Sequence, residues 1–115
     1  MSYTVVIPVL NQLHYTKQCV DSLLANSVDA TSLLIINNGS TDGTAEWLAA
    51  HPEIRSIANP VNLGCGGAWT QGALASDRDW VVLLNNDIVC AHNFIQAQID
   101  RSEERRVGKE CVQPC

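Results

Sequence analysis

Three groups of small polar and acidic residues each follow directly on an apolar run of the sequence. Asn11 follows the run over residues 3–10, residues 37–42 follow a second run, and residues 85–87 follow a third. A short apolar run is typical of a buried strand, and Asn, Gly, Ser or Asp behind it is typical of a strand-end loop. Turns need these residue types in any case, so one such loop would mean little. Three of them together favour a binding function.

Asp87 is the strongest candidate for a metal ligand. A carboxylate at a strand end can hold a hard divalent cation that also binds a diphosphate. Asn85 and Asn86 offer amide oxygens beside it. A lone Asp in a turn is more often an exposed acid, but here the apolar run leads straight into Asn-Asn-Asp. We therefore expect a cation site at this strand end.

The glycine-rich segment Gly64-Cys-Gly-Gly67 offers a second kind of binding chemistry. Backbone N–H groups at the start of a following helix could bind an anion such as phosphate. The segment lacks the G-x-G-x-x-G spacing and does not follow the first strand, which disfavours a dinucleotide fold. A tight turn that enters a helix explains the glycines about equally well.

Histidine and cysteine show no spacing that indicates chemistry. His14, His51 and His92 are better explained as surface or helix-end residues. The five cysteines include no C-x-x-C pair and their number is odd, which disfavours a zinc site or a disulfide framework. Reduced thiols in a cytosolic protein are the better interpretation.

The polar loops need a scaffold, and the apolar pattern predicts strands that alternate with helices. The predicted strands span residues 3–10, 32–37, 54–58 and 80–85, with Pro8 near the end of the first because proline cannot donate to a central ladder. The predicted helices span residues 13–26, from 41 or 42 to 51, a stretch after Gly67 with Ala68, Leu74 and Ala75 as possible buried positions, and 92–100. This alternation is typical of an α/β fold with a parallel sheet and right-handed crossovers. Ligands bind such a sheet at the carboxyl ends of the strands, near a switch in strand order.

Composition and charge exclude several classes of protein. The 115 residues suffice for one small domain, and an apolar share of 46% is that of a folding chain. The net charge of −5 disfavours a nucleic-acid binder, which needs a basic face. No apolar stretch approaches the roughly 20 residues of a membrane span, and the amino terminus lacks a signal-peptide pattern. We therefore expect a cytoplasmic chain.

Four motifs in order along residues 3–100 resemble those of family 2 glycosyltransferases with the GT-A fold, in particular the rhamnosyltransferase-like members. The family's first strand ends in proline and asparagine, as Ile7-Pro-Val-Leu-Asn11 does. Its second strand runs into a D-[DN]-x-S-x-D-G-T loop, which residues 37–44 match except at the first position. Its asparagine- and glycine-containing segment matches residues 59–67, and its D-x-D-type metal motif matches residues 85–87.

The resemblance implies a partial GT-A (Rossmann-like) fold over residues 1–100, with about four parallel strands and flanking helices. It implies a transferase that moves a sugar from a nucleotide-diphosphate sugar to an acceptor in cell-envelope polysaccharide synthesis. Mn²⁺ or Mg²⁺ at Asp87 would stabilise the leaving diphosphate. The loop with Asn37 and Asp42, together with Asn11, would face the base and ribose. The nucleotide-binding residues carried over from the family are Pro8, Asn11, Asn37, Asp42, Asn62, Gly64, Gly67, Asn85 and Asn86.

The chain also departs from the family in two respects. Asn37 stands where the family usually has an Asp that faces the base, which leaves the nucleotide preference open. The family's catalytic-base carboxylate belongs to an acceptor half that follows the metal motif by many tens of residues. We therefore expect a truncated donor half that does not turn over by itself, while the full-length protein could associate with a membrane.

The last fifteen residues differ from the rest in charge and pattern. Residues 1–100 contain three basic and nine acidic residues, whereas residues 101–115 contain four basic and three acidic ones. Such a shift is a boundary signal. Residues 101–111 also lack apolar periodicity and resemble the translation of a sequencing adapter. We predict that residues 101–115 are a non-native tail, with a solvated charged tail as the alternative.

Two other functions remain open from the sequence. A sugar-phosphate nucleotidyltransferase would need a glycine-rich basic phosphate loop soon after the first strand, and residues 11–14 are not of that kind. A non-catalytic nucleotide-binding domain would keep the same loops without a reaction. The site residues alone do not separate this last alternative from a transferase.

Overall fold

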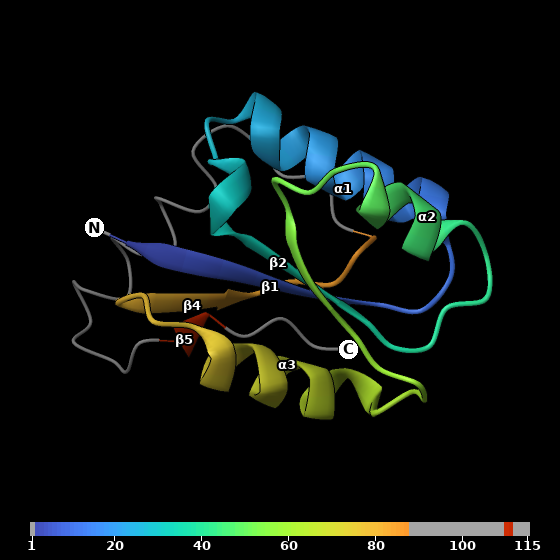
Figure 1. Cartoon of the computed structure of the whole chain (residues 1–115). Helices are drawn as coiled ribbons and strands as arrows, with labels where there is room; N and C mark the ends of the chain where they lie inside the picture. Colours follow the sequence, from blue (N-terminus) through green and yellow to red (C-terminus); the bar gives the residue numbers. More distant parts are fainter. Residues whose placement is uncertain (1, 88–109, 112–115) are drawn as a thin grey trace.

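The computed structural model describes residues 2–87 and 110–111, which form a parallel sheet with helices on both faces (Figure 1). The strands are β1 (Tyr3–Val9), β2 (Leu33–Asn37), β3 (Arg55–Ala58), β4 (Trp80–Leu83) and β5 (Glu110–Cys111). The helices are α1 (Leu13–Ala25), the short 3₁₀ helix η1 (Ala30–Ser32), α2 (Thr44–Ala49) and α3 (Gly64–Ala75). The predicted α/β fold with four parallel strands is confirmed, although several elements are shorter than their apolar patterns.

The strand order β3-β2-β1-β4-β5 contains a switch in direction. Going along the chain from β1, the sheet first grows outward through β2 to β3, and then β4 is added on the other side of β1. All four pairings are parallel, with Ile7 opposite Ile35 and Val5 opposite Val82. The carboxyl ends of β1 and β4 therefore form the switch point where an open α/β sheet binds ligands.

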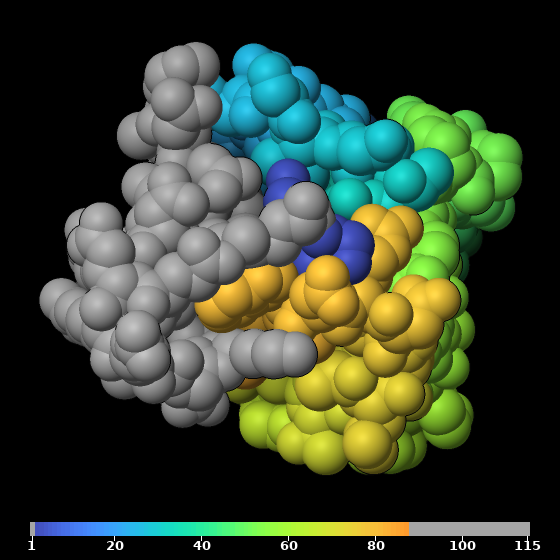
Figure 2. Space-filling view, turned by 90° about the vertical axis from the view of Figure 1, so that its left-hand side faces the viewer, coloured from blue at the N-terminus to red at the C-terminus, as the bar shows by residue number. Residues whose placement is uncertain are grey.

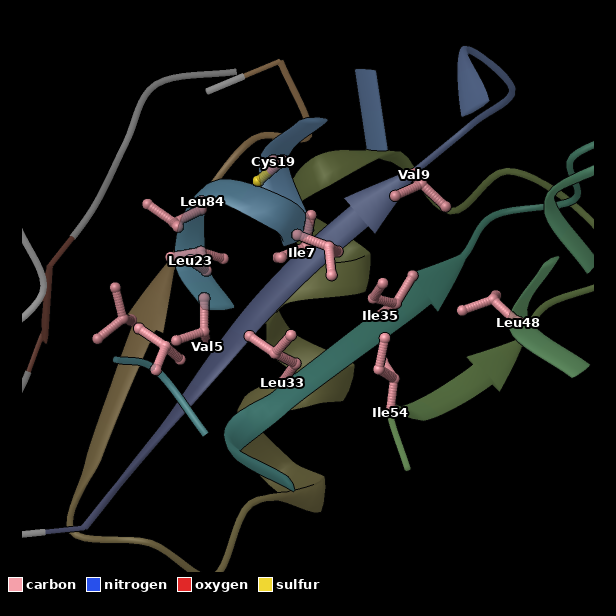
Figure 3. Close-up of a cluster of buried hydrophobic side chains, with 13 residues drawn as sticks. Val5, Ile7, Val9, Cys19, Leu23, Leu33, Ile35, Leu48, Ile54 and Leu84 are labelled. Carbon is pink, nitrogen blue, oxygen red and sulfur yellow. The ribbon is translucent and has the colours of Figure 1, made fainter. Parts of the chain in front are cut away.

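The two faces of the sheet are covered by different helices. α1 and α2 lie on one face and α3 on the other (Figure 1). Because successive strand residues point to opposite faces, Val5, Ile7 and Val9 of β1 pack with α1, while Val6 packs with α3. The larger core cluster, on the α1 and α2 face, is shown in Figure 3 and includes Leu23, Leu33, Ile35, Leu48, Ile54 and Leu84.

Helix α3 approaches the sheet closely at Gly72. A Cβ added to this glycine would collide with a methyl carbon of Val6, so only glycine fits there. The buried residues of α3 are Ala68, Trp69 and Gly72. The prediction for Ala68 is confirmed. The predictions for Leu74, whose side chain is 82% exposed, and for Ala75, which is also exposed, are wrong because the inward face of α3 runs through Gly72 instead.

Arg78 joins the amino ends of the strands, at the edge opposite the switch point. Its guanidinium donates to the carbonyl of Tyr3 (3.1 Å), the hydroxyl of Ser32 (3.1 Å) and the carbonyl of Thr31 (3.2 Å). Figure 2 views the molecule from this side, where the dark blue start of β1 lies between the cyan segment before β2 and the orange β4. These bonds hold segments together that are distant in the sequence.

Pro8 ends the pairing of β1 with β4. The backbone of Val9 faces β2, because its carbonyl accepts from the N–H of Asn38 (2.9 Å), and the backbone of Val6 faces β4, because its carbonyl accepts from the N–H of Leu84 (3.1 Å). Because every second residue of a strand directs its backbone groups to the same neighbour, residue 8 also faces β4. The next hydrogen bond between β1 and β4 would need a backbone N–H at residue 8, which proline lacks. The two strands therefore part beyond Pro8, as the sequence predicted for a proline near the strand end.

The structure bears on only some of the predictions for the carboxyl-terminal part of the chain. The predicted helix over residues 92–100 lies outside the described residues. Glu110–Cys111 pairs in parallel with β4 and falls within the predicted non-native tail, and the domain boundary at residue 100 stays a prediction. Among the described residues, no helix combines the length and the apolar character needed to cross a membrane.

Candidate functional site

A cavity of about 370 Å³ opens where β1 and β4 part. Pockets of a few hundred Å³ upward are the size class that holds small ligands. The cavity is lined by the ends of β1 and β2, the start of α3 and the segment after β4. Its lining residues are Pro8, Val9, Leu10, Asn38, Asn62, Gly64, Cys65, Asn85, Asn86 and Asp87.

The structure brings six of the predicted site residues together in this cavity and leaves four outside its lining. Those inside are Pro8, Asn62, Gly64, Asn85, Asn86 and Asp87. Those outside are Asn11, Asn37, Asp42 and Gly67. Asn38 and Cys65 also line the cavity and are not among the predicted site residues. Asn38 lies within the predicted loop over residues 37–42, but the sequence alone does not show which of its two asparagines faces the cavity.

Asn37 does not face the cavity. Its side chain is 5% exposed, and its Oδ1 accepts from the backbone N–H of Ser40 (3.1 Å). It lines a separate hollow of about 220 Å³ between α2 and β3. The structure therefore places Asn37 outside the lining of the cavity at the switch point, and its predicted contact with the base stays a prediction. Side chains alternate along β2, and Asn38 is the residue that turns toward the α3 side with Pro8.

Asn38 is held by a network of side-chain amides. Its side chain is 3% exposed. Its Oδ1 accepts from Nδ2 of Asn59 (3.0 Å) and from the backbone N–H of Leu63 (3.5 Å). Its Nδ2 donates to the carbonyl of Gly64 (3.3 Å). Asn59 and Gln71 form two hydrogen bonds with each other, at 2.8 and 2.9 Å. A buried amide held on both sides presents a fixed polarity to the cavity.

Asn11 connects the loop after β1 to the loop after β2. Its backbone is left-handed, with a φ of 57°. Its Oδ1 accepts from the backbone N–H groups of Thr41 (2.7 Å) and Asp42 (3.1 Å), and its own N–H donates to the hydroxyl of Ser40 (2.8 Å). Asn11 therefore shapes the two loops beside the cavity, and its predicted contact with the ribose stays a prediction.

Asp42 caps two helices at once. One carboxylate oxygen accepts from the backbone N–H and the hydroxyl of Thr44, at the start of α2. The other accepts from the N–H of Leu13 (3.2 Å), at the start of α1. The Thr44 hydroxyl bond is the main cause that lowers the pKa of Asp42, helped by the N–H bonds. A carboxylate at two helix amino ends is also favoured by both helix dipoles.

The glycine-rich segment forms the first turn of α3, which begins at Gly64 itself. Gly64 has a φ of +77°, a conformation that favours glycine, and no atom would meet an added Cβ there. Its N–H donates to Oδ1 of Asn62 (2.8 Å), which turns the chain into the helix. The sequence predicted a glycine-rich turn over residues 64–67 with the helix after it, whereas the helix already begins at Gly64. Gly67 lies outside the cavity and approaches Leu63.

Asp87 is exposed at the end of the cavity that follows β4. The preceding segment is attached to α1, since Nδ2 of Asn86 donates to the hydroxyl of buried Thr16 (3.2 Å) and the thiol of Cys19 lies 3.8 Å from the carbonyl of Asn85. Within residues 2–87, no three Asp, Glu, His or Cys side chains are grouped as a complete metal site. The oxygen donors nevertheless suit a hard cation whose other ligands are phosphate and water.

The profile of the family described as Glycosyl transferase family 2 matches residues 4–113. An N-acetylglucosaminyl-diphospho-decaprenol L-rhamnosyltransferase of Mycobacterium tuberculosis is 31% identical, over 84% of this chain and 37% of that protein. An uncharacterized glycosyltransferase of Rickettsia bellii is 27% identical, over 88% of this chain and 15% of that protein. The chain thus spans a minor part of these relatives.

Solved structures share the fold. S. aureus TarS, residues 1–349, superposes with a TM-score of 0.76 at 16% identity, covering 92% of this chain and 33% of that TarS chain. TarS has also been solved in complex with UDP. The mannosyltransferase PcManGT from Pyrobaculum calidifontis, solved with GDP-Man and Mn²⁺, superposes with a TM-score of 0.65 at 19% identity, covering 79% of this chain and 29% of that protein.

Proposed function

Because the chain belongs to glycosyl transferase family 2, we propose that its cavity binds the nucleotide-sugar donor of a sugar transfer reaction. The position of the cavity supports this proposal most directly, since it opens at the switch between β1 and β4. GDP-Man in the complex of PcManGT is such a donor, and UDP in the complex of TarS is the nucleoside diphosphate part of one. We take the acceptor to be bound by parts of the whole protein beyond the described residues.

The cavity has two chemically different ends. Asp87 follows β4 and Asn38 follows β2, with β1 between them. Neighbouring strands lie about 4.8 Å apart, so the two ends are roughly 10 Å apart, comparable to the distance between the base and the diphosphate of an extended nucleotide. We assign the diphosphate to the Asp87 end and the base to the Asn38 end. The start of α3, at Gly64, lies along the same cavity.

Asp87 would hold Mn²⁺ or Mg²⁺ together with phosphate oxygens, and the cation would supply electrostatic stabilisation to the leaving diphosphate. The chain's own contribution is to place this carboxylate. The bonds of Asn86 to Thr16 and of Cys19 to the Asn85 carbonyl hold the segment before it against α1. A segment held in this way needs little rearrangement of its backbone to place the carboxylate when a charged ligand arrives.

A sugar-phosphate nucleotidyltransferase is less well supported. That function needs a basic phosphate-binding loop after the first strand, and no Lys or Arg is among the described residues that line the cavity. The loop after β1 is instead occupied by the bonds of Asn11 to the next loop. A non-catalytic nucleotide-binding domain would have the same cavity, and a transfer assay on the full-length protein distinguishes it from an enzyme.

The first experiment measures the binding of UDP, dTDP and GDP to the chain by calorimetry, with and without MnCl₂. We expect Asp87→Ala to weaken metal-dependent binding at least about tenfold, as losses around metal ligands do. The fold should persist, because Asp87 lies in an exposed strand-end loop. Asp79→Ala is the matched control, since Asp79 is an exposed acid directly before β4. Equal affinities for the wild type and Asp87→Ala would refute the metal role.

A further inference from the structure

We propose that Asn59 and Gln71 are positioning residues that fix the carboxamide of Asn38 so that the cavity offers a hydrogen-bond donor to the nucleobase. The inference rests on the proposed function, because it assigns the base to the Asn38 end of the cavity. It goes further by stating that the edge of the base that meets Asn38 must carry a hydrogen-bond acceptor. It also gives a role to Gln71, a residue of α3 that does not line the cavity.

The bonding of Asn38 leaves one group for a ligand. A carboxamide oxygen has two lone pairs and its nitrogen has two hydrogens. Both lone pairs of Asn38 are used, by Asn59 and by the N–H of Leu63, and one hydrogen is used by the carbonyl of Gly64. Among the described residues, the second N–H of Asn38 has no partner. A ligand that reaches Asn38 therefore meets a donor.

Two backbone groups determine which way the amides point. The Leu63 N–H can only donate and the Gly64 carbonyl can only accept, so a flipped Asn38 would place like groups against each other. These two contacts are long, at 3.5 and 3.3 Å. The shorter bonds are those of Asn59, to Asn38 at 3.0 Å and to Gln71 at 2.8 and 2.9 Å. The backbone selects the orientation, and the Asn59–Gln71 pair stabilises it.

The pair also joins three separate parts of the fold. Asn59 directly follows β3, and its backbone N–H donates to the carbonyl of Asn37 at the end of β2 (2.8 Å). Gln71 lies on α3, one residue before Gly72 and its close contact with β1. Because α3 packs closely against the sheet at Gly72, the position of Gln71 is fixed, and its amide can orient the side chain of Asn59. A surface amide on a loop would not orient its partner in this way.

The test compares UDP with CDP, whose pyrimidine edges differ by exchange of donor and acceptor at positions 3 and 4. We expect the wild-type chain with Mn²⁺ to bind UDP about fivefold or more tightly than CDP, because the Asn38 donor would pair with the O4 acceptor of uracil and oppose the N4 amine of cytosine, and a wrongly paired polar group costs at least that. Gln71→Met keeps the length of the side chain and removes both bonds, and should bring the ratio toward one. Asn59→Asp, which cannot donate when ionised, should turn the Asn38 oxygen toward the ligand and reverse the preference. Leu74→Met, on the exposed face of α3, should leave the ratio unchanged.

Amide NMR signals provide a measurement that does not depend on ligand. In the wild type, the side-chain NH₂ groups of Asn38, Asn59 and Gln71 should exchange slowly with solvent, and Gln71→Met should abolish the protection of Asn59. Equal loss of affinity for UDP and CDP in Asn59→Asp, or a wild-type ratio near one, would overturn the inference. If no nucleoside diphosphate binds the wild type, the proposed function fails, and unprotected amides would show that the positioning fails as well.

Discussion

At the residue scale, neighbouring asparagines have different environments. Asn37 and Asn38 end the same strand, yet Asn37 is buried beside α2 and only Asn38 lines the cavity. Asn11 and Asp42 lie close by, but their polar atoms bind the backbone of the opposite loop. Polar residues at strand ends therefore divide into those that face the ligand and those that hold the loops in place.

Substitution of the two asparagines separates these roles. Asn38→Asp replaces the donor that faces the cavity by an acceptor and should change the ratio of UDP to CDP affinities by about fivefold or more. Asn37→Asp should change the ratio little and lower the stability instead, since it places a carboxylate charge at a position that is buried. Calorimetry and thermal unfolding of both variants test this. A larger change of ratio in Asn37→Asp would restore the sequence-based assignment.

Asp42 should make the stability of the fold depend on pH in the acid range. Its folded pKa lies below its ordinary value of 3.8 because it accepts bonds from Thr44 and Leu13. A lowered folded pKa contributes stability that is present above the unfolded pKa and lost as the pH falls through the folded pKa. Asp42→Asn should therefore lower the Tm at pH 6, and the difference from wild type should shrink toward pH 3.

Asp21→Asn, on the exposed surface of α1, is the matched control for Asp42→Asn. Its effect on the Tm should be small at both pH values. A difference between the wild type and Asp42→Asn that stays constant from pH 6 to pH 3 would show that the charge of Asp42 does not stabilise the two helix ends.

At the element scale, the placement of α3 controls the cavity. α3 supplies Gly64 and Cys65 to the cavity lining and Gln71 to the amide network. Its distance from the sheet is set at Gly72, where the helix backbone lies against Val6. Residues far along this helix therefore influence the ligand site without touching it.

Gly72→Ala should destabilise the fold by about 1–3 kcal/mol, as overpacking of a core does, because its Cβ would collide with the side chain of Val6. Val6→Ala added to Gly72→Ala should recover part of the loss, since it removes the colliding methyl carbons. Gly66→Ala is the control, because an added Cβ there meets no atom and alanine favours a helix. Urea unfolding measures all of these variants. Equal stability of Gly72→Ala and Gly66→Ala would exclude the close contact.

At the scale of the whole molecule, the sheet is held at both ends by side chains. Arg78 ties the amino ends of the strands, and Asn11 and Asp42 tie the loops at their carboxyl ends. β5 adds a pairing of two residues on β4, from the segment predicted to be a non-native tail. The stability of residues 2–87 should therefore depend little on that segment.

Removal of residues 101–115 tests the domain boundary. The shortened chain should keep its Tm within a few degrees and its Mn²⁺-dependent affinity for UDP, because the described residues of this segment contribute two rungs to the sheet. Differential scanning calorimetry and titration of both lengths provide the comparison. A large drop of the Tm, or loss of nucleotide binding, would show that these residues belong to the domain.

The sequence alone determined the elements of this protein and the loops that carry its site. Apolar runs of the length of a strand, separated by amphipathic segments, predict an α/β sheet, because such periods are local properties of the chain. Proline near the end of β1 and the polar residues behind three strands likewise indicated where the sheet would open. Six of the ten predicted site residues line the cavity for that reason.

Only the tertiary structure decided which side of each element faces the ligand and which faces the core. Asn38 rather than Asn37 lines the cavity because the pairing of β2 with β1 determines which of its side chains point to the α3 side of the sheet. Gly72 rather than Leu74 meets the sheet because the axis of α3 is set by its contact with Val6. The Asn59–Gln71 pair and the double cap by Asp42 join residues from different elements. Contacts of this kind depend on how separate elements pack, which no local pattern in the sequence encodes.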